Sequence, residues 1–120
     1  MHQVKADPSR QILYLTITSK IEPEDAPQII TRLKQEITKL KPGYMAAIDL
    51  RGLTVINPNL NNALLELQKI LVAGQPEKIS TLLSSAVLKM QINQAGHKSG
   101  INLNAQRFDD EAAWKQFLGI

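Results

Sequence analysis

Few residues in this sequence of 120 residues have side chains suited to acid–base or nucleophilic chemistry. The chain has no cysteine and two histidines, His2 and His97, which excludes disulfides, thiolate metal sites and cysteine nucleophiles. His97 is the candidate general base. It stands beside Gly96, Lys98 and Ser99, in a stretch predicted to be a helix-to-strand turn, where an exposed histidine is the simpler interpretation. We therefore expect a protein that is not an enzyme.

Patterns that bind metals or phosphates are also missing. A metal site needs convergent ligands of suitable type, and the acidic run from Asp109 to Glu111 is typical of a helix start, where negative charge favours the helix dipole. None of the six glycines forms a glycine-rich phosphate-binding loop. The sequence therefore predicts no metal site and no cofactor.

Asp49 is the acidic residue that the sequence places at the end of a central strand. The run from Tyr44 to Leu50 is almost continuously apolar, as in a parallel strand buried on both faces. In receiver domains an aspartate here accepts a phosphoryl group beside an acidic pair on an earlier strand, but the earlier strand ends in Thr18, Ser19 and Lys20. We expect the Asp49 side chain to order the following loop by hydrogen bonding to the backbone of that loop. The alternative is that Asp49 accepts a phosphoryl group.

Hydrophobic periodicity predicts the elements that position these residues. Strands are predicted at 4–6, 12–18, 44–50, 78–84 and 101–105, and helices at 24–40, from 58 up to Gly74, at 85–95 and from 109 or 110 onward. The order ββαβαβαβα implies an α/β fold: a mostly parallel, mixed sheet of about five strands with four covering helices. We expect residues 1–120 to form a single domain.

Two of the helix predictions rest on particular residues. Asn57 before Pro58 predicts a helix start, because asparagine is a good N-cap and proline is favoured at the first helical position. For the helix at 85–95, with Ser84 or Ser85 as cap, the residues expected on the inner side are Val87, Leu88, Met90, Gln91 and Ile92. Gly96 and Gly100 are expected to bracket the turn that follows.

The charge of the chain is modest and dispersed. Fourteen Lys and Arg against eleven Asp and Glu give a net charge of +3 and a pI near 9.3. From Lys78 to Phe108 there are four basic residues and no acidic one, so one edge of the fold is expected to be mildly positive. Because aromatic residues that stack on bases are few, we expect no nucleic-acid binding.

Apolar runs are short throughout the chain. The longest, from Tyr44 to Ile48, is far below the roughly 20 residues of a membrane-spanning helix. The N-terminal residues lack the apolar stretch of a signal peptide. We expect a cytoplasmic protein without membrane insertion.

The segment from Ala47 to Leu67 resembles the central element of STAS domains, the family of bacterial anti-sigma factor antagonists and of the cytoplasmic tails of sulfate transporters. In that family a strand ends in Asp-Leu-Ser-Gly, an apolar segment follows, and a helix starts with Asp-Ser-Ser-Gly. The corresponding residues here are Asp49-Leu50-Arg51-Gly52 and Asn57-Pro58-Asn59-Leu60. The segments 90–97 and 107–114 are similar to small bacterial SpoIIAA-like proteins. The resemblance spans nearly the whole chain and implies the STAS fold.

The chain departs from this family at the helix start. In anti-sigma factor antagonists a serine there is phosphorylated by the partner kinase, and the added charge breaks the complex. The residues from Asn57 to Leu60 carry no hydroxyl, and Thr54 lies earlier, in the apolar segment. The resemblance therefore implies a regulatory, non-enzymatic protein-interaction module in which the serine switch is absent or has moved.

These considerations leave two hypotheses about function. The first is that another protein binds the helix start through the uncharged polar surface of Asn57, Pro58, Asn59, Asn61 and Asn62; the alternative is that these residues only cap and solvate the helix. The second hypothesis is a small-molecule or lipid-binding domain similar to Sec14-type relatives, with an apolar ligand between sheet and helices in place of a fully packed core. A homodimer is expected if an edge strand or an apolar helix face is left exposed.

Overall fold

The computed structural model of the protein describes residues 2–101 and 105–120. Its elements, in chain order, are β1 His2–Asp7, β2 Ile12–Ile17, α1 Asp25–Ile37, β3 Met45–Asp49, the 3-10 helix η1 Pro58–Leu60, α2 Asn61–Ala73, β4 Lys78–Leu82, α3 Ala86–Ser99, β5 Ala105–Phe108 and α4 Glu111–Leu118. The predicted order ββαβαβαβα is confirmed, with one short 3-10 helix added before α2.

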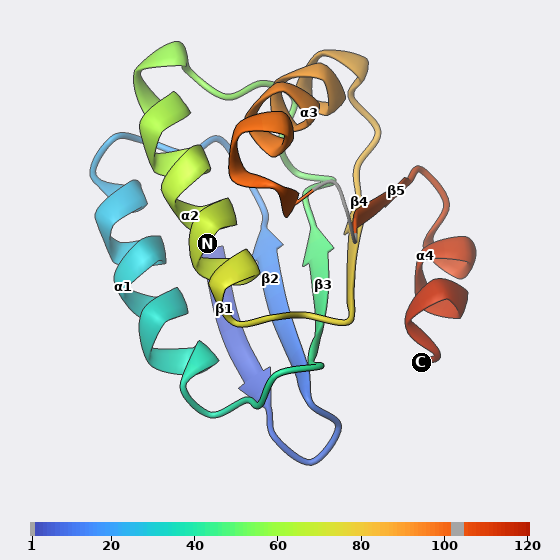
Figure 1. The fold of residues 1–120 in the computed structure, drawn as a ribbon. Helices are drawn as coiled ribbons and strands as arrows, with labels where there is room; N and C mark the ends of the chain where they lie inside the picture. The colour runs from blue at the N-terminus through green and yellow to red at the C-terminus, as the bar shows by residue number, and fades with distance from the viewer. Residues whose placement is uncertain (1, 102–104) are drawn as a thin grey trace.

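The five strands form one mixed sheet in the order β1-β2-β3-β4-β5. β1 runs antiparallel to β2, and the later neighbours pair in parallel, so the predicted α/β class and mostly parallel sheet are confirmed. Helices α1, α2 and α3 lie on one side of the sheet, and α4 lies apart from them beyond β4 and β5 (Figure 1). Within the described residues, no helix has the length and apolar character needed to cross a bilayer.

The register of the strands sets which side chains share the face beneath α1, α2 and α3. Val4 pairs with Leu15, Leu15 with Ile48, Ile48 with Thr81, and Thr81 with Arg107. Paired residues point to the same side of a sheet, so these five side chains form a row across the whole sheet. The row begins aliphatic at β1 and ends polar at β4 and β5.

A smaller core lies on the opposite face, under α4. It consists of Ile12, Ala47 and Leu82 from the sheet with Trp114 and Leu118 from the helix. The indole Nε1 of Trp114 donates a hydrogen bond of 2.8 Å to a backbone carbonyl of β4. Both faces of the central strands are therefore buried, as the continuously apolar sequence of β3 predicts.

The prediction for α3 was wrong in its length and in its inner face. The helix continues to Ser99, so Gly96 is buried inside it and does not bracket a turn, and His97 lies exposed in its last turn. The inward residues are Leu88, Ile92 and Gly96, spaced one helical turn apart.

Two apolar residues expected on the inner side of α3 are instead exposed. Val87 is 56% and Met90 62% exposed. With 100° between successive residues, Val87 lies about a right angle away from Leu88 and Met90 nearly opposite it. The half-buried Gln91 lies at the edge of the inner face. The apolar residues at the start of α3 therefore suggested a wider buried face than the helix has, since only a narrow stripe of it packs against the rest of the protein.

The remaining element boundaries differ from the predictions by a few residues. Ser85 caps α3 and Asp110 caps α4, each through its side chain. Of the strand predicted at 101–105, residues 102–104 lie outside the described residues. The observed strand β5 begins at Ala105 and continues to Phe108, which places Arg107 within the sheet.

Candidate functional site

Asp49 lies at the carboxyl end of β3 and binds the loop that follows. Its Oδ1 accepts hydrogen bonds of 3.1 Å from both the backbone N–H and the Nε of Arg51, and its Oδ2 accepts one of 2.8 Å from Nη2. These side-chain hydrogen bonds, opposed by partial burial, hold the pKa of Asp49 below its ordinary value. The Nη1 of Arg51 reaches Glu111 of α4 at 2.7 Å, so the loop is connected to the start of α4.

Gly52 follows in this loop because the backbone of Thr18 passes against it. A Cβ built on Gly52 would overlap the backbone carbonyl of Thr18. The glycine of the Asp-Leu-Arg-Gly segment is therefore required by a close approach between the ends of β2 and β3.

The end of the same loop is fastened to α3. The amide side chain of Gln91 accepts a hydrogen bond from the N–H of Ile56 and donates one to its carbonyl, at 2.8 and 2.7 Å. The hydroxyl of Ser85 donates to the carbonyl of Thr54. Val55 lies between these two attachment points and is 49% exposed, so it stands beside the first turns of α3.

The predicted helix start is formed as a 3-10 turn that leads into α2. Asn57 accepts a hydrogen bond of 3.0 Å from the N–H of Asn59 through its side chain, with Pro58 at the first helical position. The side chains of Asn61 and Asn62 follow in the first turn of α2 and are exposed, as are those of the three residues before Leu60.

A groove of about 160 Å³ separates the start of α2 from α3. It brings together Asn61, Asn62 and Leu65 of α2 with Gln91, Gln94, Ala95 and Lys98 of α3. The structure thus places two of the five predicted partner-binding residues in one groove, while Asn57, Pro58 and Asn59 lie at the preceding 3-10 turn. We call this feature the α2–α3 groove.

Exposed aliphatic side chains lie on α3 and on the loop that is attached to it. Val87 and Met90 are three residues apart on α3, which places them on neighbouring positions of one helix face. Val87 lies one turn before the groove residue Gln91, and Val55 lies on the attached loop. Among the described residues, the only other large hydrophobic side chain that is exposed is Ile120. Three of these four residues therefore lie on α3 or on the loop that is hydrogen-bonded to it.

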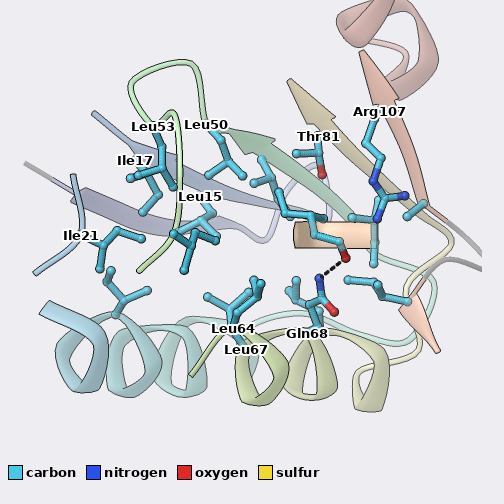
Figure 2. A pocket seen from close by; sticks show the side chains of 18 residues that line it. Leu15, Ile17, Ile21, Leu50, Leu53, Leu64, Leu67, Gln68, Thr81 and Arg107 are labelled. Atoms are coloured by element: carbon cyan, nitrogen blue, oxygen red, sulfur yellow. Dashed lines mark hydrogen bonds between the residues drawn. The ribbon is translucent and has the colours of Figure 1, made fainter. Parts of the chain in front are cut away.

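A cavity of about 70 Å³ lies between the sheet and helices α1, α2 and α3. Aliphatic side chains such as Leu15, Ile48 and Leu67 form most of its wall, and Gln68, Thr81 and Arg107 form the polar part. The picture shows the Arg107 side chain extending from β5 into the space between sheet and α2 (Figure 2). Burial lowers the pKa of Arg107 relative to its ordinary value, yet an arginine stays protonated.

Gln68 belongs to this cavity and also fixes α2 to α3. Its Nε2 donates a hydrogen bond of 3.3 Å to the carbonyl of Ile92, and its Oε1 accepts one of 2.8 Å from the hydroxyl of Ser99. The amide is therefore engaged in holding two helices together. Thr81 and Arg107 are paired neighbours on adjacent strands of the sheet.

The candidate metal ligands and His97 lie apart in the part of the chain that the structure describes. Within residues 2–101 and 105–120, no group of three or more His, Asp or Glu side chains is placed to hold a metal ion. His97 is exposed on the last turn of α3. A further hollow of about 820 Å³ lies between β1 and α1, lined by polar residues such as His2, Asp25 and Arg32. The α2–α3 groove and the apolar cavity are the hollows that the predicted binding functions concern.

The fold is that of a known structure, although the sequence matches no family model and no curated protein. Among solved structures, the chain is similar to that of the anti-sigma factor antagonist SpoIIAA in its unphosphorylated form. The TM-score is 0.59 at 15% sequence identity, over 100% of this chain and 98% of the other. The protein has the STAS/SpoIIAA-like fold. The resemblance seen at residues 47–67 is confirmed for the fold.

Sequence reasoning missed Gln91, Arg107 and the exposed pair on α3 as site residues. Arg107 carried a usable signal, because it lies among four basic residues with no acidic one between Lys78 and Phe108. Gln91 carried none, since a glutamine that binds a backbone distant in sequence looks like any other helix residue.

Proposed function

We propose that this protein is a cytoplasmic, non-enzymatic regulatory module that binds another protein at the α2–α3 groove and the adjoining helix start. The observation that carries the proposal is the α2–α3 groove, which is lined by exposed amides and followed along α3 by an exposed aliphatic side chain. Asn61 and Asn62 line it, and Val87 lies one helical turn before the groove residue Gln91.

The composition of this surface suits a protein partner. Exposed aliphatic side chains that cluster on a monomer favour protein association, and amides at the rim supply hydrogen bonds that set the register of the contact. Lys98 adds a positive charge, and the sequence of α3 contains no acidic residue. The partner segment that fits best carries aliphatic anchors and a carboxylate.

Regulation of this contact differs from the serine switch of anti-sigma factor antagonists. The residues from Asn57 to Leu60 have no side chain that accepts a phosphoryl group. We infer that the partner is released by another route, such as competition or a change in its own state.

An affinity-capture experiment tests the proposal. Asn59→Asp and Asn62→Asp each add a negative charge at the surface, and Val87→Asp places one on its aliphatic end. We expect each to weaken capture of the wild-type partner by about tenfold or more, as for residues central to an interface. The matched control is Gln116→Asp, which makes the same change at an exposed position of α4. Retention of every partner by the three surface variants would remove the basis for this function.

A further inference from the structure

The cavity between the sheet and the helices has a graded wall. The cross-sheet row passes from Leu15 and Ile48 to Thr81 and then to Arg107, and all four line the cavity. A hydrocarbon group is favoured at the aliphatic end, because it avoids water there. A hydrogen-bonding anion is favoured at the other end, where a hydroxyl and a guanidinium stand on adjacent strands.

Arg107 is suited to a carboxylate in particular. A guanidinium presents a planar pair of N–H donors that match the two oxygens of a carboxylate. It is half-buried among apolar walls, where an anionic partner offsets part of the cost of desolvating the cation. Thr81 is 5% exposed and pairs with Arg107 across the strands, so its hydroxyl is a second donor for the same anion.

The size of the space limits the hydrocarbon part. The cavity of about 70 Å³ adjoins a second of about 60 Å³, and the two share Ile21, Ile29, Ile56, Leu64 and Leu67. A cavity of about 150 Å³ holds a benzene molecule, so the combined space suits roughly four to five carbons. A long acyl chain does not fit without separating the helices from the sheet.

We propose that this cavity binds a short, unbranched or branched aliphatic carboxylate, with its chain among the leucines and isoleucines and its carboxylate held by Arg107 and Thr81. This site is separate from the α2–α3 groove and goes beyond the protein-binding function. It also narrows the predicted apolar ligand to an acid of defined size.

The test is a methyl-detected NMR titration of the full chain with pentanoate, and with pentan-1-ol as the uncharged match. Pentanoate is expected to shift the methyl resonances of Leu15, Ile48 and Leu67 and to bind about tenfold tighter than pentan-1-ol, the gain of a charge-assisted hydrogen-bonded pair. Dodecanoate represents a lipid-derived acid, and it is expected to bind more weakly than pentanoate.

Variants separate the role of Arg107 from general attraction to a basic protein. Arg107→Gln is expected to remove the advantage of pentanoate over pentan-1-ol, and Thr81→Val, which keeps the shape of the side chain, to reduce it. Arg51→Gln is the matched control at an exposed arginine and is expected to leave it unchanged.

Three results would overturn the proposal. They are equal binding of pentanoate and pentan-1-ol to the wild-type protein, methyl shifts confined to residues outside the cavity, and tighter binding of dodecanoate than of pentanoate. None of the three needs a variant, so the proposal stays testable even if Arg107→Gln does not fold.

Discussion

The amide side chain of Gln91 binds both backbone polar groups of Ile56, accepting from its N–H and donating to its carbonyl at 2.8 and 2.7 Å. Ile56 is buried, and buried backbone groups are costly to leave without partners. This one side chain on α3 therefore holds the end of the loop that leads into the start of α2. The shape of the α2–α3 groove depends on it, because Gln91 also lines the groove.

Gln91→Leu is predicted to destabilise the protein by about 1–3 kcal/mol, the cost of leaving buried hydrogen-bonding groups unsatisfied. Urea unfolding measures the loss, and hydrogen exchange of the Ile56 amide should become faster. The control is Gln94→Leu, which removes an exposed amide from the same helix and should change both quantities little. An unchanged hydrogen-exchange rate of the Ile56 amide in Gln91→Leu would show that the two hydrogen bonds between Gln91 and Ile56 are not formed in solution.

Gly52→Ala is predicted to destabilise the fold by about 1–3 kcal/mol, as overpacking does. The added methyl group meets the backbone of Thr18, and a strand end moves less easily than a side chain. Thermal unfolding measures the effect, with Thr54→Ala as the control at an exposed position of the same loop. Equal melting temperatures for the two variants would contradict the close approach.

Glu36 is predicted to make the stability of the folded protein fall at acid pH. It is 3% exposed, and its pKa is lowered first by the hydrogen bond from Lys39 and then by that from the N–H of Ala6. Because the folded pKa lies below the unfolded one, its contribution is present above the unfolded pKa of about 4.3 and is lost as pH falls through the folded pKa.

Glu36→Gln should therefore be less stable than the wild-type protein at pH 7, by about 1–3 kcal/mol for hydrogen bonds to a buried charged group. It should also lose less stability between pH 5 and pH 3, in an unfolding series measured at constant ionic strength. Glu66→Gln is the control at an exposed carboxylate. The idea fails if the two variants follow the same pH profile.

The ion pair between Asp49 and Arg51 is predicted to contribute little, in contrast to Glu36. The Arg51 side chain is 52% exposed, and exposed pairs contribute about 0–1 kcal/mol and weaken with salt. Arg51→Ala should therefore lower the free energy of unfolding only slightly, and by less still in 1 M salt. A larger, salt-independent loss would mean that Asp49 and Arg51 hold the loop more firmly than their exposure indicates.

The sequence was sufficient for the sheet and for most helix boundaries, because periodicity reports which face is buried. The alternation in β2 reflects a strand with one face more buried than the other, as observed. The continuous apolar residues of β3 reflect a strand that is buried on both faces, as observed. Asn57 and Pro58 are local signals that act through their own backbone, so the helix start was predicted as well.

The inner face of α3 could not be obtained in the same way. Val87 and Met90 are as apolar as Leu88 and Ile92, so the residue types alone do not predict which pair is buried. In the structure, Leu88 and Ile92 share the buried face of the helix with Gly96. The α2–α3 groove and the graded cavity depend on contacts between residues far apart in the chain, such as Gln91 with Ile56 and Thr81 with Arg107. They emerge only from the assembled fold.

Site-specific photo-crosslinking in the cells that naturally express the protein tests its central claim most directly. A photoreactive side chain placed at Asn62 is predicted to give a covalent adduct with a specific partner protein, or with a second copy of the chain, and the adduct should disappear in the presence of Val87→Asp. The same side chain placed at Gln116 should give no such adduct. Equal adducts at both positions, or none at Asn62, would contradict a protein-binding role for the α2–α3 groove.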